Sequence, residues 1–116
     1  MAILNFQKQF ADAIKDGSKC QTIRKRRKYP IKKGDTLYLY TGLRTKNAEK
    51  LKEIKCSDVL KVKMDWKKVA LPAIVINYLE YLDEFAIADG FEDWTEMINW
   101  FESVHGIPFE GDIIMW

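Results

Sequence analysis

Residues that commonly bind metal ions or form disulfides are scarce in this sequence. Its 116 residues include one histidine, His105, and two cysteines, Cys20 and Cys56. No CxxC pair occurs and neither cysteine has a histidine partner, so the spacing matches neither a zinc site nor a redox motif. We therefore expect free thiols in a reducing compartment, no metal ion and no cofactor. His105 precedes Gly106, which indicates a cap at a helix end rather than a catalytic base.

The sequence also lacks an apolar stretch of the roughly 18 residues that a membrane-spanning helix needs. Near the N-terminus there is no basic segment followed by an apolar one, which a secretion signal would require. These absences predict a cytoplasmic protein without a membrane partner. Hydrophobic residues make up 47% of the chain, which is enough for one core at this length, so we expect a single domain over residues 1–116.

Basic residues are absent from the C-terminal part of the chain. All 19 Lys and Arg lie at or before Lys68, together with 7 acidic residues, which gives this part a net charge of +12. The part after Lys68 has 10 acidic residues and a net charge of −10. Two interpretations stay open: the charges pair across one fold, or the basic part forms a face for nucleic acid. The dense basic run over residues 24–28, with Lys32 and Lys33 beyond it, favours nucleic acid, because a polyanion relieves the repulsion among neighbouring cations.

Hydrophobic periodicity predicts the secondary structure of the first half. Apolar residues at helical spacing predict a helix over residues 6–16, with Asn5 as its cap and Gly17 at its end. The other expected elements there are strands over 20–25 and 36–41, a helical or looped excursion over 43–52, and a long strand over 53–66.

The second half is expected to alternate between strands and helices. In order, we expect a strand over 73–82, with a helix as the alternative for its second half, and then a short helix over 83–88. A helix capped by Asp93 and Glu96 follows and ends at Gly106, and the last strand, over 109–116, starts at a turn of residues 110–112. Five or six strands with two or three helices indicate an α+β fold. The sequence therefore predicts a small, mostly antiparallel β-barrel with two or three flanking helices.

The segment from Gly17 to Arg24 contains the most informative polar residues. Lys19, Thr22 and Arg24 follow the expected helix-ending glycine at spacings of two, five and seven. Alternate residues of a strand share a face, so Thr22 and Arg24 point the same way. Lys19 joins them only if a turn or bulge intervenes. The segment therefore predicts a small polar site under that condition.

Three short motifs make the chain resemble the ASCH family, a branch of the PUA-like β-barrels. They are Phe6…Phe10…Ile14…Gly17-x-Lys19-x-x-Thr22-Ile23-Arg24, then Gly34-Asp35-x-Leu37, then Ala88-Asp89-Gly90-Phe91. The resemblance implies a PUA-like barrel that contacts RNA or a modified pyrimidine nucleoside. Some small bacterial members hydrolyse the acetyl amide of N(4)-acetylcytidine, and others are reported to cleave RNA.

The resemblance also implies roles for three residues. In the amidohydrolase members the motif lysine is the proton acceptor, the motif threonine the nucleophile and a downstream glutamate the proton donor. At matching positions of this chain these are Lys19, Thr22 and Asp89. The sequence departs from the family pattern at Asp89, which is one methylene shorter than glutamate, and at the basic insertions after Arg24 and over 43–55.

Amide hydrolysis requires a neutral amine as the base and a protonated carboxyl as the acid, and Lys19 and Asp89 have these forms near neutral pH only in suitable surroundings. Lys19 is a base near neutral pH only where burial or nearby cations lower its pKa, and Asp89 is an acid only where burial raises its pKa. Ordinary structural roles stay open for all three: a surface lysine, a strand-forming threonine and a turn-forming aspartate.

Six neighbouring residues are candidates for binding RNA. They are Arg24, Lys25, Arg26, Arg27, Lys28 and Tyr29, the tyrosine as a surface on which a base stacks. Three functions follow from the sequence: an enzyme that deacetylates N(4)-acetylcytidine, a non-catalytic RNA-binding module, and a metal-independent ribonuclease.

Overall fold

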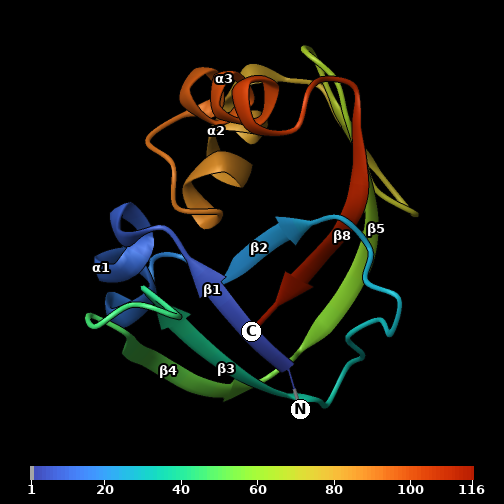
Figure 1. Ribbon diagram of the computed structural model, residues 1–116. Coiled ribbons are helices and arrows are strands. Elements are labelled where there is room, and N and C mark those ends of the chain that lie inside the picture. The colour runs from blue at the N-terminus through green and yellow to red at the C-terminus, as the bar shows by residue number, and fades with distance from the viewer. Residues whose placement is uncertain (1) are drawn as a thin grey trace.

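Two β-sheets and three α-helices make up the computed structural model, which describes residues 2–116 (Figure 1). One sheet has the strand order β1-β3-β4 and the other has the order β2-β8-β5-β6-β7. Helices α2 and α3 lie together at one end of the molecule, and α1 lies beside the three-stranded sheet. The α+β class and the flanking helices predicted from the sequence are confirmed.

The three-stranded sheet begins with β1 (Ala2–Phe6), where the sequence pattern suggested that a helix starts. Strand β1 pairs in parallel with β3 (Thr36–Thr41), which pairs antiparallel with β4 (Glu49–Lys55). After β1 the chain forms a short 3-10 helix, η1 (Lys8–Phe10), and then α1 (Ala11–Asp16). The predicted helix over 6–16 therefore started too early. Alternate residues of β1 are buried, so a strand buries Phe6 as well as a helix would.

The five-stranded sheet is antiparallel throughout. Strand β8 (Phe109–Met115) lies between β2 (Gln21–Arg24) and β5 (Asp58–Met64), and the short strands β6 (Val69–Ala70) and β7 (Val75–Ile76) extend the sheet beyond β5. The predicted turn at residues 110–112 is wrong, because Gly111 lies inside β8 opposite Val62. A Cβ atom at Gly111 would lie 2.3 Å from the carbonyl oxygen of Arg24, so glycine here permits close approach of two backbones.

Two strands replace the single long strand predicted over 53–66, and part of the predicted excursion is β4. The break falls at Cys56 and Ser57, whose amides donate to the carbonyls of Asp35, directly before β3, and of Met115 at the end of β8. This crossing lets the chain leave the first sheet and enter the second. The alternation of apolar residues continues through the break, so the sequence pattern alone does not reveal it.

Strand β7 lies within the segment predicted as a strand over 73–82, and helix α2 (Leu79–Ala88) takes up the last four residues of that segment, where the sequence left a helix open. The following helix, α3 (Trp94–Val104), begins as predicted, since the carboxylate of Asp93 accepts from the amide of Glu96 at 2.8 Å. A second carboxylate, on Asp83 of α2, accepts from the amide of Trp94 at 2.9 Å and joins the two helices. No helix within residues 2–116 is long and apolar enough to span a membrane.

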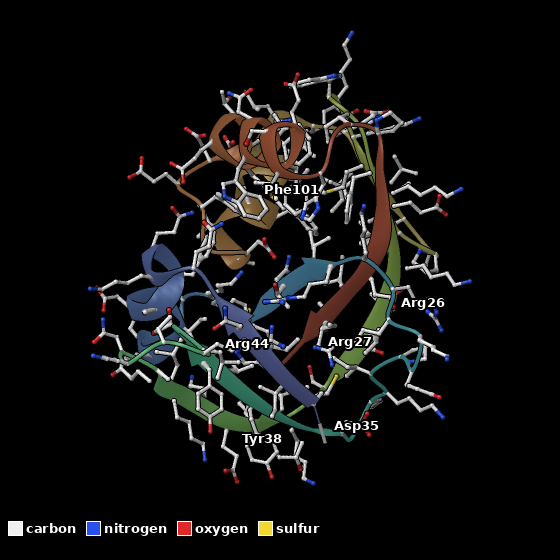
Figure 2. All side chains as sticks on the ribbon, in the orientation of Figure 1. Arg26, Arg27, Asp35, Tyr38, Arg44 and Phe101 are labelled. Atoms are coloured by element: carbon white, nitrogen blue, oxygen red, sulfur yellow. The ribbon has the colours of Figure 1, made fainter. Side chains whose placement is uncertain are left out.

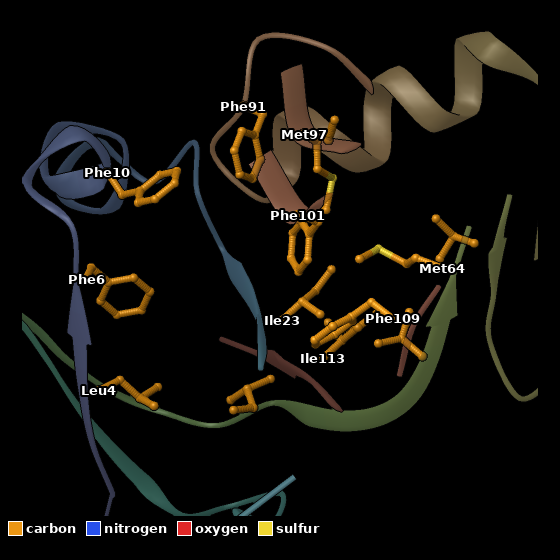
Figure 3. Packing of buried hydrophobic residues seen from close by; sticks show 14 of the residues in the cluster. Leu4, Phe6, Phe10, Ile23, Met64, Phe91, Met97, Phe101, Phe109 and Ile113 are labelled. Carbon is orange, nitrogen blue, oxygen red and sulfur yellow. The ribbon is translucent and has the colours of Figure 1, made fainter. Parts of the chain in front are cut away.

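The buried core runs between the two sheets and under the helices (Figure 3). Leu4 and Phe6 of β1, Ile113 of β8, and Met97 and Phe101 of α3 all belong to it. Within residues 2–116 the two sheets pack around one core and share no hydrogen-bonded strand ladder, so no closed barrel is detected and the predicted β-barrel is not confirmed.

Candidate functional site: a buried lysine–aspartate pair in an aromatic pocket

The end of helix α1 determines where Lys19 lies. Gly17 adopts a left-handed conformation with φ of 88° and ends the helix. The amide of Lys19 then donates to the carbonyl of Ala13, and the amide of Cys20 donates to the carbonyl of Ala88 at the end of α2. Lys19 therefore precedes strand β2 in an irregular segment. This is the turn that the sequence required for Lys19 to join Thr22 and Arg24.

Lys19 is almost completely enclosed, with 2% of its surface exposed. Its Nζ donates to the main-chain oxygen of Asp89 and lies 3.7 Å from Oδ1 of the same residue. The aromatic rings of Phe6 and Phe10 lie with their centroids 5.7 Å and 5.0 Å from Nζ. A carbonyl, a carboxylate and two ring faces thus replace water around this amine.

Burial shifts the pKa values of Lys19 and Asp89 in the directions that favour the neutral form of each side chain. Asp89, 3% exposed, has its pKa raised to about 6 because burial outweighs the attraction of Lys19 and the hydrogen bond from Gln21. The Gln21 Nε2 donates to Asp89 Oδ1 at 3.4 Å. Burial also lowers the pKa of Lys19, and the nearby Arg24 lowers it further, although Asp89 opposes this shift. The amine therefore releases a proton, and the carboxyl holds one, more readily than in water.

Gly90 makes room for the lysine side chain. A Cβ atom built at Gly90 would lie 2.9 Å from Lys19 Cδ and 3.1 Å from Phe10 Cδ1. Gly90 also has φ of +93°, a conformation that other residues adopt at a cost. The Asp89-Gly90 pair thus places the carboxyl beside the amine and leaves space for the lysine stem.

A pocket of about 360 Å³ opens onto this pair. Thr22 and Arg24, successive residues on one face of β2, line it together with Lys19 and Asp89. The Arg24 guanidinium lies 4.7 Å from the centroid of the Phe6 ring and donates to the main-chain oxygen of Asn5 at 2.6 Å. Burial, with help from Arg27, lowers the pKa of Arg24 to about 10, so it is still a cation at neutral pH.

Thr22 lines the pocket and its hydroxyl has no partner within residues 2–116. Thr22 is a buried residue of β2, opposite Ile114 of β8. Among residues 2–116 its hydroxyl forms no hydrogen bond within the protein, and it is not sealed from the pocket. The hydroxyl is therefore available to a ligand.

Aromatic residues that the sequence interpretation did not assign to the site form much of the pocket wall. They are Phe6 and Phe10 on one side and Phe91, Trp100, Phe101 and His105 on the other. Phe6 and Phe10 face Phe91 and Phe101 in Figure 3. Four residues of the α3 segment, Trp100, Phe101, Val104 and His105, have the spacing of one helix face, so the sequence did contain this signal. His105 caps α3 as predicted and also lines the pocket.

The predicted RNA-binding residues separate into two groups. Arg24 and Lys25 line the pocket, whereas the next four residues lie outside it. Arg26 forms an ion pair with Asp112 at 3.2 Å at the outer edge of the molecule (Figure 2). Arg27 donates to the carbonyl of Ile3 at 2.9 Å, and Lys28 lies 5.7 Å from the ring centroid of Tyr29, which is 80% exposed. The structure thus places a strongly basic loop directly after the pocket strand.

Comparison with known proteins identifies no relative. No family model, no curated protein and no solved structure matches the chain. The function is therefore inferred from the pocket itself and from the motifs that the sequence contains.

Proposed function

We propose that the pocket around Lys19 binds a modified pyrimidine nucleoside and hydrolyses an amide on its base. N(4)-acetylcytidine is the substrate that the resemblance to the ASCH family implies. The observation that carries the proposal is that Lys19, Thr22 and Asp89, from two distant parts of the chain, line one pocket in which burial shifts the pKa values of Lys19 and Asp89. Under this proposal the two sheets correspond to a PUA-like barrel of that family.

The pocket lining suits a flat, polar ring. Small-molecule sites typically start at about 300 Å³ and are mostly apolar with a few directed polar groups. This pocket has a similar volume, about 360 Å³, and its aromatic rings offer stacking surfaces for a pyrimidine. Its cations, Arg24 and Lys25, suit carbonyl oxygens or a phosphate at the mouth.

In the proposed reaction the Thr22 hydroxyl attacks the carbonyl carbon of the acetyl group. The proton of the hydroxyl passes to the neutral amine of Lys19, and a C–O bond forms. Negative charge develops on the carbonyl oxygen, where the guanidinium of Arg24 supplies the stabilising positive charge. The lowered pKa of Lys19 supports this role, because an ordinary lysine would already be protonated.

Breaking the amide requires a proton on the leaving nitrogen. Asp89 in its acid form donates this proton as the C–N bond breaks, and cytidine leaves. Lys19 passes the proton that it took from Thr22 to the neighbouring Asp89 carboxylate, which restores the neutral amine and the acid. Water then attacks the acetyl ester on Thr22 while Lys19 takes a proton from the water. Lys19 returns this proton to the Thr22 oxygen as the C–O bond of the ester breaks, and acetic acid leaves and ionises to acetate. A buried carboxyl with a pKa of about 6 is protonated in a useful fraction of molecules near neutral pH.

Product analysis tests this function. Purified protein incubated with N(4)-acetylcytidine should release cytidine and acetate in equal amounts. We expect Thr22→Val, which removes the hydroxyl and keeps the strand-forming shape, to lower kcat by at least about 100-fold, as the loss of a nucleophile does. Thr22→Ser, which keeps the hydroxyl, should retain measurable turnover. Absence of turnover by the unmodified protein, or equal turnover by Thr22→Val, contradicts the proposal.

A non-catalytic RNA-binding function is the second candidate, and the exposed basic loop favours it. Arg27, Lys28 and Tyr29 lie outside the pocket, where a polynucleotide can reach them. In this case the pocket holds one unstacked base and the loop contacts phosphates. A ribonuclease that acts without metal is the third candidate, and it would yield cleavage products in the presence of a chelator.

A further inference from the structure

Large apolar side chains are concentrated on the surface of β7 and α2. Ten such side chains are exposed among residues 2–116, and six of them fall within residues 74–87: Ile74, Val75, Tyr78, Leu79, Tyr81 and Ile87. Tyr78 is 71% exposed and Leu79 63% exposed. Single exposed apolar residues are ordinary on protein surfaces, but a cluster of this kind is typical of a contact surface.

This surface is hollowed. A groove of about 540 Å³, here called the α2–β7 groove, is lined by residues 74–78, which include β7, and by residues of α2, among them Ile74, Ile76, Tyr78, Tyr81 and Phe85. The rings of Tyr78 and Tyr81 meet edge to face with their centroids 6.4 Å apart. Strand β7 is the outermost strand of its sheet, so it offers an unpaired edge beside the groove.

The charges around the groove are of one sign. Glu84 lines it, Glu80 is exposed on the first turn of α2, and no basic residue lines it. The chain has no Lys or Arg after Lys68, so the segment that forms the groove contributes only acidic groups. A ligand that fits this surface therefore combines apolar side chains with positive charge.

We propose that the α2–β7 groove docks an extended segment of a partner protein in which Lys or Arg flanks apolar residues. The segment adds a strand to the edge of β7 and places its apolar side chains between Tyr78 and Phe85, while its cations meet Glu80 and Glu84. A second copy of the chain bound through the same face would place Glu80 and Glu84 of one copy next to those of the other, and the like charges would repel. An anionic lipid surface would meet the same repulsion.

Binding of synthetic peptides tests this proposal with the full chain. The probes are two fluorescent 12-residue peptides (a length of about 40 Å when extended) with the same alternating Val/Tyr core, one flanked by Lys and Arg and the other by Glu. We expect the basic peptide to bind at least tenfold more tightly by fluorescence anisotropy. The double variant Tyr78→Ser/Leu79→Ser should lose this binding, and Glu80→Lys/Glu84→Lys should reverse the preference.

Matched controls separate docking from unfolding. Ile3→Ser removes a comparably exposed apolar side chain from β1 and should leave peptide affinity unchanged. Thermal unfolding of each variant shows that it is folded, since all the changed side chains are exposed. Equal affinity for the two peptides, binding of neither, or affinity that survives Tyr78→Ser/Leu79→Ser overturns the proposal. Two further outcomes would overturn the proposal: a homodimer, or adhesion to phosphatidylglycerol vesicles, that is lost in Tyr78→Ser/Leu79→Ser. Either outcome would show that a different partner occupies the surface.

Discussion

Lys19 and Asp89 show how burial alters two side chains that are ordinary in water. Each is held where its charged form loses hydration, so the pKa of the amine falls and that of the carboxyl rises to about 6. The two groups are close enough to titrate as a pair, and the proton on one affects the other. The pair is therefore suited to proton transfer and depends on both members for stability.

We expect Lys19→Met to destabilise the protein in a pH-dependent way. The substitution keeps an apolar stem but leaves Asp89 buried without its cation, which raises the pKa of Asp89 above its present value of about 6. The pKa of Asp89 is then higher in the folded variant than in the unfolded chain, where it is 3.8. The free energy of unfolding is therefore unaffected by Asp89 below pH 3.8 and falls as the pH rises through the folded-state pKa, because the buried carboxyl then becomes charged. Urea unfolding should show a loss of about 3 kcal/mol at pH 8 and a smaller loss at pH 5.

The double variant Lys19→Met/Asp89→Asn is the control for this interpretation. It removes both charges, so a large part of the lost stability should return at pH 8 and the difference between pH 5 and pH 8 should shrink. An equal loss for Lys19→Met at both pH values would show that Asp89 is not the group responsible.

At the scale of the elements, the turn after α2 determines whether the site forms. Gly90 combines a positive φ with contact to Lys19 and Phe10. We expect Gly90→Ala to reduce stability by about 1–3 kcal/mol and also to lower any turnover that depends on Lys19, because the new methyl group displaces the lysine stem. Unfolding curves and kcat measurements on the same preparation check both effects.

Gly34→Ala provides the matched control. Gly34 has nearly the same φ, +91°, but a Cβ atom there would meet nothing within 4 Å. This variant should lose about 1 kcal/mol from backbone strain alone and keep its activity. If the two variants lose the same activity, contact with Lys19 is not what makes Gly90 necessary.

The sequence predicted elements well where local signals are strong. Strand β3, the capping of α3 by Asp93 and the end of α1 at Gly17 are confirmed, because each has a local chemical cause. The helix predicted over 6–16 began too early, and only Val75–Ile76 of the strand predicted over 73–82 is a strand, while its last residues are helical, the alternative that the pattern left open. In both places the spacing of the apolar residues fits the helical period of about 3.6 residues as well as the strand period of about 2 residues. Packing against distant parts of the chain decides between helix and strand there.

The candidate site followed a similar pattern. The motifs predicted that Lys19, Thr22 and Asp89 meet in one hollow, and the structure brings them together. Their catalytic roles stay predictions. The aromatic wall from α3 could not be placed from sequence, because its contact with Phe10 depends on how α3 packs across the chain.

At the scale of the whole molecule, the uneven distribution of charge is partly neutralised within the fold. Five ion pairs occur among residues 2–116, and three of them join the basic part to the acidic part: Lys19–Asp89, Arg26–Asp112 and Lys63–Glu110. The basic loop after β2 keeps exposed cations beyond Arg26. Pairing across the fold is therefore confirmed for these three ion pairs, and a face for a polyanion stays a prediction.

We expect single-stranded RNA to bind in a salt-sensitive way if the loop binds phosphates. Arg27→Glu/Lys28→Glu should weaken binding and reduce the slope of log K against log salt by about 1 for each phosphate that the variant no longer binds. Lys67→Glu/Lys68→Glu makes the same change of charge between β5 and β6 and serves as the control. Equal weakening by the two pairs would mean that net charge, and not the loop, governs binding.

The most direct test of the proposed function is a crystal structure of the protein with cytidine, the product of the proposed reaction. We predict that the pyrimidine ring lies in the pocket against the aromatic side chains of Phe10 and Trp100, with its exocyclic amine directed at Lys19 and Asp89 and the Thr22 hydroxyl beside it. Cytidine bound at another surface, or bound in the pocket with the amine directed away from Lys19 and Asp89, would contradict this function.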